Sequence, residues 1–136
     1  MIIFKKHFAI GFLAILVNSV SHAQFTSPSQ AFKVSAIKSI DEIEITLAPQ
    51  GDFFLYKDKI TVYDGQSKTP MPIKSISGKT KLKKLPDASS RYVYESAAQV
   101  YVAKPKGEFL KVDYQGCSHQ GICLPPQHKW IRVSND

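Results

Sequence analysis

Apolar and polar residues alternate with a period of two along most of this chain, and this pattern restricts it to β-strands. Ile43, Ile45 and Leu47 alternate with charged or polar neighbours, so the aliphatic side chains would face a core and the others water. Long amphipathic helical patterns are absent from the sequence. Further short runs rich in β-branched and aromatic residues lie at 31–37, 53–56, 59–63, 71–75, 92–94, 98–103, 108–114 and 129–133. The sequence therefore predicts an all-β fold.

Turn-forming residues separate these runs at short intervals. They lie at 49–52, 64–65, 78, 86–87, 105–107 and 121. Many short strands with this spacing, in about a hundred residues, are typical of an immunoglobulin-like antiparallel β-sandwich, with a small barrel as the alternative. Residues 79–90 are charged and poor in apolar side chains, so we expect a mobile loop there.

The first 23 residues have the pattern of an export signal. Two lysines precede an apolar run over residues 8–17, and Ser-His-Ala at 21–23 supplies the small-x-small pattern that signal peptidase cleaves. The run is short for a membrane span, and an uncleaved anchor is the alternative. We expect residues 1–23 to be a signal peptide and residues 24–136 to form one exported domain.

The formal net charge of +7 includes a lysine cluster between residues 79 and 84. Such a cluster can bind nucleic acid or an acidic membrane. An exported protein meets little nucleic acid, however, and no arginines interleave with aromatic residues in the cluster. We therefore expect a solvated loop or edge strand and no nucleic-acid partner, since lysines on an edge also discourage aggregation.

Cys117 and Cys123 are the two cysteines of the chain, and an oxidising compartment favours pairing them. The runs on either side would pair as a hairpin and bring the two Cα atoms within bonding reach. Closing so short a ring stabilises the fold by only on the order of 2 kcal/mol in the loop-entropy account. Spacing alone favours a structural staple over a redox site but leaves both open.

A metal site is a third interpretation of this segment. His119 lies between the cysteines and His128 follows them, and two thiolates with two imidazoles can hold zinc or copper. The spacing matches no usual zinc finger, and export favours oxidised sulfur. We therefore expect no metal, and we expect His119 to be a solvent-facing loop residue.

Residues 112–127 read Val-Asp-Tyr-Gln-Gly-Cys-Ser-His-Gln-Gly-Ile-Cys-Leu-Pro-Pro-Gln. This segment resembles the Y-Q-G-C-x5-C-x-P-P signature of the N-terminal periplasmic domain of the thiol:disulfide interchange protein DsbD. Gly-Asp-Phe-Phe-Leu-Tyr-Lys-Asp-Lys-Ile at 51–60 and Ser-Gln-Ala-Phe at 29–32 are similar to that family in the same order. The resemblance covers nearly all of the exported domain, and it reverses the preference from staple to redox site.

The resemblance implies an immunoglobulin-like domain in the periplasm that works without a cofactor. In that family the domain passes electrons from a membrane-embedded or thioredoxin-like reductant to periplasmic thioredoxin-like proteins, of the disulfide isomerase or cytochrome-maturation type. Carried over to this chain, Cys123 forms the mixed disulfide with partners and Cys117 resolves it. The chain would then be a protein-disulfide reductase component. Because it ends at Asp136, we expect a stand-alone domain that works in trans with a DsbD- or CcdA-like membrane donor.

The resemblance also implies a set of residues around the disulfide. Phe54 and Tyr56 match aromatic positions that line the family's active-site surface, although both also fit an ordinary sandwich core. The family covers its disulfide with a loop carrying acids and an aromatic residue. Here the matching stretch has Leu85 and Asp87 at its tip, and Tyr92 either substitutes for the aromatic or begins the next strand.

A different class of function stays open beside the redox one. The chain would then be a non-catalytic, exported, immunoglobulin-like binding module whose hairpin disulfide is a staple. Such a staple has a strongly reducing potential and does not exchange with partner thiols.

Overall fold

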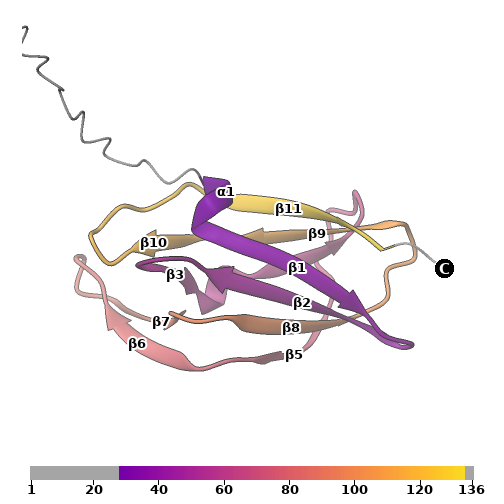
Figure 1. The fold of residues 1–136 in the computed structure, drawn as a ribbon, viewed down its shortest axis with the longest axis horizontal. Coiled ribbons are helices and arrows are strands. Elements are labelled where there is room, and N and C mark those ends of the chain that lie inside the picture. Colours follow the sequence, from indigo (N-terminus) through magenta and orange to yellow (C-terminus); the bar gives the residue numbers. More distant parts are fainter. Residues whose placement is uncertain (1–27, 134–136) are drawn as a thin grey trace, which may run out of the picture.

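A computed structural model describes residues 28–133, and the predicted signal peptide lies outside this range. The described chain forms an elongated β-structure that begins with a single helical turn, α1 (Pro28–Ala31) (Figure 1). The first strands are β1 (Phe32–Lys38), β2 (Glu42–Pro49), β3 (Phe53–Tyr56), β4 (Thr61–Asp64) and β5 (Ile73–Ser77), with the 3-10 turn η1 (Lys57–Lys59) after β3. The later strands are β6 (Thr80–Lys84), β7 (Ser90–Tyr94), β8 (Ala98–Ala103), β9 (Phe109–Tyr114), β10 (Gly116–Ser118) and β11 (Gln127–Arg132).

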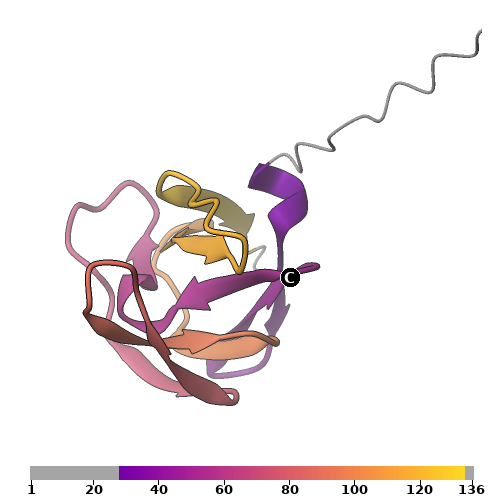
Figure 2. The same cartoon turned by 90° about the vertical axis from the view of Figure 1, so that its left-hand side faces the viewer.

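The strands form three antiparallel sheets with the orders β1-β2-β8-β5, β10-β3-β7-β6 and β11-β9-β4. Seen from the end of the molecule, they surround a common interior (Figure 2). This arrangement confirms the all-β prediction. No helix in the described range is long and apolar enough to cross a membrane.

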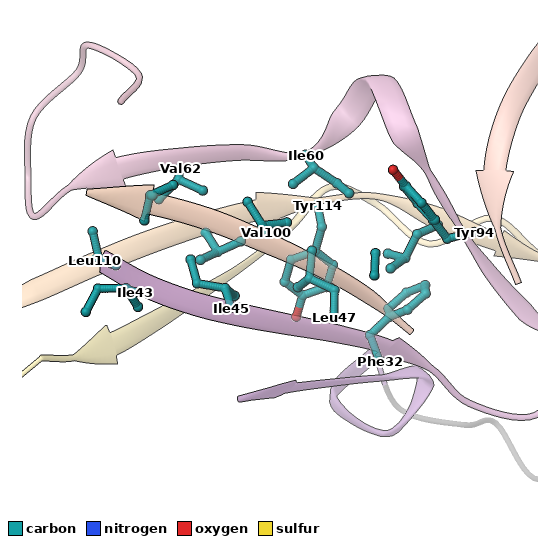
Figure 3. Close-up of a cluster of buried hydrophobic side chains, with 14 of the residues drawn as sticks. Phe32, Ile43, Ile45, Leu47, Ile60, Val62, Tyr94, Val100, Leu110 and Tyr114 are labelled. Carbon is teal, nitrogen blue, oxygen red and sulfur yellow. The ribbon is translucent and has the colours of Figure 1, made fainter. Parts of the chain in front are cut away.

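The main core lies between the first sheet and the other two (Figure 3). Its period-two pattern is clearest in β2, where Ile43, Ile45 and Leu47 are buried and their neighbours are half-buried, as predicted. Val100 and Val102 of β8 face the same interior, opposite Leu110 and Val112 of β9. Burial of these aliphatic side chains is the main stabilising contribution to the fold.

β3 is buried on both of its faces, because all four of its residues are buried. Phe53 and Leu55 point into the main core. Phe54 and Tyr56 point the other way, into a second and smaller cluster. The strand thus separates two buried regions, and the second of them contains a cysteine.

The expected mobile loop at 79–90 is wrong, but the edge strand expected as one alternative for the lysine cluster at 79–84 is confirmed, because β6 is the last strand of its sheet. Most of this stretch is the hairpin of β6 and β7, in which Thr80 pairs with Tyr94 and Lys84 with Ser90. Only residues 85–89 remain as a loop, and a backbone hydrogen bond of 2.8 Å from Leu85 N–H to Ser89 C=O closes it. The other predicted strands agree with the structure to within about two residues at each end.

Candidate redox site

The cysteine segment leaves one sheet and joins another. β9 ends at Tyr114, which pairs with Gln127 of β11, so the two flanking strands form the predicted hairpin. Between them, β10 pairs with β3 in a different sheet and places Cys117 directly opposite Phe54. This excursion brings the cysteines to the face of β3 that is turned away from the main core.

Gly116 allows β10 to pair with β3, because the backbones of the two strands approach closely at this residue. A Cβ atom at this position would collide with the Phe54 carbonyl oxygen and lie 2.7 Å from Cζ of Phe32. The absence of a side chain lets β10 pack against β3. Residue 116, directly before Cys117, therefore has to be a glycine for β10 to pack this closely against β3.

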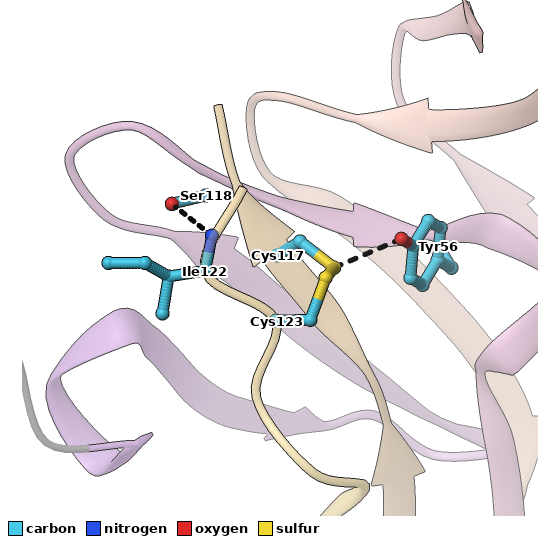
Figure 4. The surroundings of a disulfide bond; sticks show 5 residues. All are labelled: Tyr56, Cys117, Ser118, Ile122 and Cys123. Atoms are coloured by element: carbon cyan, nitrogen blue, oxygen red, sulfur yellow. Dashed lines mark hydrogen bonds between the residues drawn. A yellow bond between two sulfur atoms is a disulfide. The ribbon is translucent and has the colours of Figure 1, made fainter. Parts of the chain in front are cut away.

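Cys117 and Cys123 form a disulfide, with 4.0 Å between their Cα atoms. They are an isolated antiparallel bridge pair, flanked by hydrogen bonds from Ser118 N–H to Ile122 C=O and from Leu124 N–H to Gly116 C=O. This is a non-hydrogen-bonded pair, the type in which opposing residues approach most closely. The Ser118 hydroxyl also accepts a hydrogen bond of 3.2 Å from Ile122 N–H, which tightens the loop (Figure 4).

The two cysteines differ in their access to solvent. Cys117 is 3% exposed. Cys123 is exposed, on the outer arm of the loop. A molecule approaching from solvent can therefore reach Cys123, whereas the protein shields Cys117.

Cys117 belongs to an aromatic pocket that we call the site cluster. It consists of Phe54, Tyr56, Val93 and Cys117, with Leu85 packed against it. The rings of Phe54 and Tyr56 meet edge to face, with 5.7 Å between their centroids. The Tyr56 hydroxyl lies 3.0 Å from Cys117 Sγ (Figure 4), and it is the donor because a disulfide sulfur carries no proton. Of the predicted surrounding residues, Phe54 and Tyr56 thus belong to the cluster that contains Cys117, and Leu85 packs against it.

The other two predicted residues lie outside the site cluster. Asp87 is at the tip of the 85–89 loop, where hydrogen bonds from the Ser89 hydroxyl and backbone N–H hold the pKa of its carboxyl below the usual value. Tyr92 is 56% exposed and lies under the Lys57 ammonium, 6.0 Å from the ring centroid. Because successive side chains of a strand point to opposite faces, Tyr92 lies on the face of β7 opposite to that of Val93.

A group of charged residues around the site cluster was missed by the sequence analysis. The Lys83 ammonium lies 4.5 Å from the Phe54 ring centroid, and the Arg91 guanidinium lies 5.1 Å from that of Tyr56. His119 is not merely a solvent-facing loop residue, because its ring packs on Phe54 at 5.1 Å between centroids. The sequence pattern that could have indicated Lys83 is Thr-Lys-Leu-Lys-Lys at residues 80–84. In a strand, this spacing places Lys81 and Lys83 on the same face.

The two histidines weighed for a metal site lie on different strands and loops. His119 follows β10, whereas His128 lies on β11 opposite Asp113. Within residues 28–133, no group of three or more His, Cys, Asp or Glu side chains is placed to hold a metal ion.

Comparisons with known proteins agree with this geometry. Residues 22–135 match the family described as "Thiol:disulfide interchange protein DsbD, N-terminal". The DsbD protein of Ralstonia nicotianae is 28% identical over 80% of this chain and 19% of its own length. That of Campylobacter jejuni is 30% identical over 77% of this chain and 19% of its own length. The chain therefore spans about a fifth of the length of these relatives.

Two solved structures share the fold. The reduced DsbD N-terminal domain of Neisseria meningitidis has a TM-score of 0.65 and 24% identity, covering 80% of this chain and 89% of that chain. A chain from the complex between the DsbD N-terminal and PilB N-terminal domains of the same organism has a TM-score of 0.60 and 21% identity, covering 83% and 90%. The predicted immunoglobulin-like sandwich is confirmed.

Proposed function

Because this chain belongs to the family of the DsbD N-terminal domain, we propose that it passes electron pairs between thiol proteins through the Cys117–Cys123 disulfide. The observation that carries the proposal is the unequal burial of the two cysteines, with Cys123 exposed and Cys117 3% exposed. Thiol–disulfide exchange needs one sulfur that a partner can reach and one that leaves and returns. The asymmetry supports Cys123 as the sulfur that a partner reaches and Cys117 as the sulfur that leaves and returns.

The exchange begins when the reduced domain meets an oxidised partner. The Cys123 thiolate attacks one sulfur of the partner disulfide, so a mixed disulfide forms and the second partner sulfur leaves as a thiolate. Cys117, as a thiolate, then attacks Cys123 Sγ and displaces the first partner sulfur. The domain ends as the disulfide, and the partner as a dithiol that has gained two electrons and two protons. The same steps in reverse reload the domain from a reductant.

Tyr56 has a direct part in this chemistry. Burial disfavours the thiolate form of Cys117, both as a leaving group and as the resolving nucleophile. The Tyr56 hydroxyl, 3.0 Å from Cys117 Sγ, is placed to donate a hydrogen bond to the developing negative charge. Phe54 and Leu85 keep water from the same sulfur.

The partners we propose are thioredoxin-like proteins of the periplasm, of the disulfide isomerase or cytochrome-maturation type, with a DsbD- or CcdA-like membrane protein as electron donor. The solved complex of DsbD and PilB N-terminal domains supports partner docking within this family. Leu85 and Asp87 would contact the partner beyond the sulfur, whereas Tyr92 lies on the opposite face of β7 from the site cluster. Export through a signal peptide at residues 1–23 would deliver the domain to the periplasm.

Partner trapping tests the division of roles. In Cys117→Ser the resolving sulfur is missing, so we expect mixed disulfides to accumulate through Cys123 when the variant is expressed in the periplasm. We expect Cys123→Ser to trap far fewer, because its remaining cysteine is buried. Non-reducing electrophoresis with and without a reductant measures both, and the wild type supplies the background. Equal trapping by the two variants, or none by either, would contradict the proposal.

A further inference from the structure

Two cations stand side by side on the sheet face that carries the site cluster. Lys83 of β6 and Arg91 of β7 are direct cross-strand partners, and both are half-buried. Like charges at directly opposed positions destabilise a sheet. The juxtaposition of these two like charges is therefore electrostatically unfavourable in itself.

The aromatic residues of the site cluster hold these two cations in place. The Lys83 ammonium lies 4.5 Å from the Phe54 ring centroid, and the Arg91 guanidinium 5.1 Å from that of Tyr56. Phe54 is the direct strand partner of Cys117, and Tyr56 contacts its sulfur. Each cation is thus one aromatic ring away from Cys117.

His119 orients the lysine further. Its Nδ1 lies 2.8 Å from Lys83 Nζ, and its Nε2 lies 3.4 Å from Glu95 Oε1. A neutral imidazole with the proton on Nε2 satisfies both contacts, because Nδ1 then accepts from the ammonium and Nε2–H faces the carboxylate. The contact joins β6 to the cysteine loop.

Nearby carboxylates leave this pair of charges largely uncompensated. Glu95 is engaged by Lys81 at 3.7 Å and by His119. Asp87 is influenced by Arg91, but it is bound within its own loop by Ser89. In the part of the chain that the structure describes, neither Lys83 nor Arg91 forms an ion pair within 4.0 Å of a carboxylate.

We propose that Lys83 and Arg91 form a cationic rim that selects thiol partners with acidic side chains around their reactive cysteine. The inference rests on the proposed exchange function and specifies the chemistry of the partner. Charge complementarity at a contact surface raises the rate of encounter and suppresses partners of like charge. The rim borders the site cluster, which contains Cys117, the disulfide partner of the exposed Cys123.

Small thiols of different charge test the rim without knowledge of the natural partner. The oxidised domain is reduced with 2-mercaptoethanesulfonate, 2-mercaptoethanol or cysteamine, whose side groups are anionic, neutral and cationic. Rate constants are expressed per thiolate to remove differences in thiol pKa. At low salt we expect the sulfonate to react roughly ten-fold faster than the ammonium thiol. The ratio should fall toward one as the salt concentration is raised toward about 1 M.

Variants assign the preference to the two cations. Lys83→Gln combined with Arg91→Gln should bring the ratio close to one, and it should fold well because it removes a like-charge pair. The charge-keeping combination Lys83→Arg with Arg91→Lys should retain the preference. Lys84→Gln is the matched control, because Lys84 is exposed on the other face of β6 and should leave the ratio unchanged.

The outcomes separate this inference from the function on which it rests. Two outcomes would overturn the rim and leave the exchange function standing. One is reduction of the disulfide by all three thiols at equal rate constants, and the other is a preference for the sulfonate that persists in the double glutamine variant. Failure of all three thiols to reduce the disulfide in the folded protein would overturn both. An equal change in Lys84→Gln would show a general charge effect and count against the rim.

Discussion

The main core and the site cluster are both buried, but they are built from different residues. The main core is mostly aliphatic and closed between sheets, with Ile45, Val100 and Leu110 fully inaccessible. The site cluster combines two aromatic rings, a valine and a sulfur, and cations border it. Burial of hydrocarbon stabilises the fold in the first region. In the second region burial encloses a cysteine sulfur, and we propose that this enclosure controls the reactivity of the sulfur.

β3 connects the two regions because its side chains alternate between them. Phe53 and Leu55 anchor the strand in the main core. The strand is therefore a rigid support for Phe54 and Tyr56, which face Cys117. Rigid elements of this kind hold a reactive group more accurately than a loop does.

The largest expected effect comes from the main core. Ile45→Ala removes a fully buried side chain, and we expect it to lower the free energy of unfolding by about 2–5 kcal/mol. Denaturant titration measures the loss. Ile37→Ala is the control, because Ile37 is 64% exposed and should change stability by less than about 0.5 kcal/mol. The rate of thiol exchange in the folded fraction of Ile45→Ala should be unchanged. A large change in that rate would show that the main core and the site cluster do not act independently.

A smaller loss of stability is expected where the two regions touch. Gly116→Ala forces a Cβ against the Phe54 backbone and the Phe32 ring, so we expect a loss of about 1–3 kcal/mol together with altered exchange kinetics. Gly107→Ala is the matched control, since its Cβ would meet only Asp64 Oδ1 at 3.8 Å. Thermal unfolding of both variants measures the difference. Equal stability of the two would mean that β10 can shift away from β3 at little cost.

The smallest effect on stability is expected inside the site cluster. Tyr56→Phe removes the hydroxyl at Cys117 Sγ, and we expect a loss of only about 0.5–1.5 kcal/mol. The reduced protein should show a raised pKa of the Cys117 thiol, because the thiolate loses a hydrogen-bond donor. Ultraviolet thiolate absorbance in a pH titration of Cys123→Ser, with and without Tyr56→Phe, isolates that thiol. Tyr101→Phe, on β8 in another sheet, is the control. An unchanged thiol pKa would remove Tyr56 from the chemistry.

Apolar patterns in the sequence predicted most of the strands but indicated neither β6 nor the short β10. Ile43, Ile45 and Leu47 alternate with polar residues because one face of β2 is buried against hydrocarbon. β6 has the same alternation, but its site-facing residues are Lys81 and Lys83. A lysine that packs on an aromatic ring cannot be distinguished, from the sequence alone, from a lysine that is fully solvated. The strand therefore could not be recognised from hydrophobic periodicity.

Recognition of the candidate site from sequence was also partial, for a physical reason. The resemblance supplied Phe54, Tyr56 and the two cysteines, and the structure brings all four together. The contacts of Lys83 and Arg91 with the two rings depend on the pairing of β6 with β7, which no local motif specifies. Long-range strand pairing is the information that spacing along a chain does not contain.

The reduction potential of the Cys117–Cys123 disulfide distinguishes an exchange site from a structural staple. The protein is equilibrated with graded ratios of reduced and oxidised glutathione, and the fraction of free thiol is measured after rapid alkylation. An exposed exchange site should have a potential well above about −300 mV, within reach of thioredoxin-like proteins. A potential below about −300 mV, with no reduction across the glutathione series, is the result expected of a structural staple and would contradict the account.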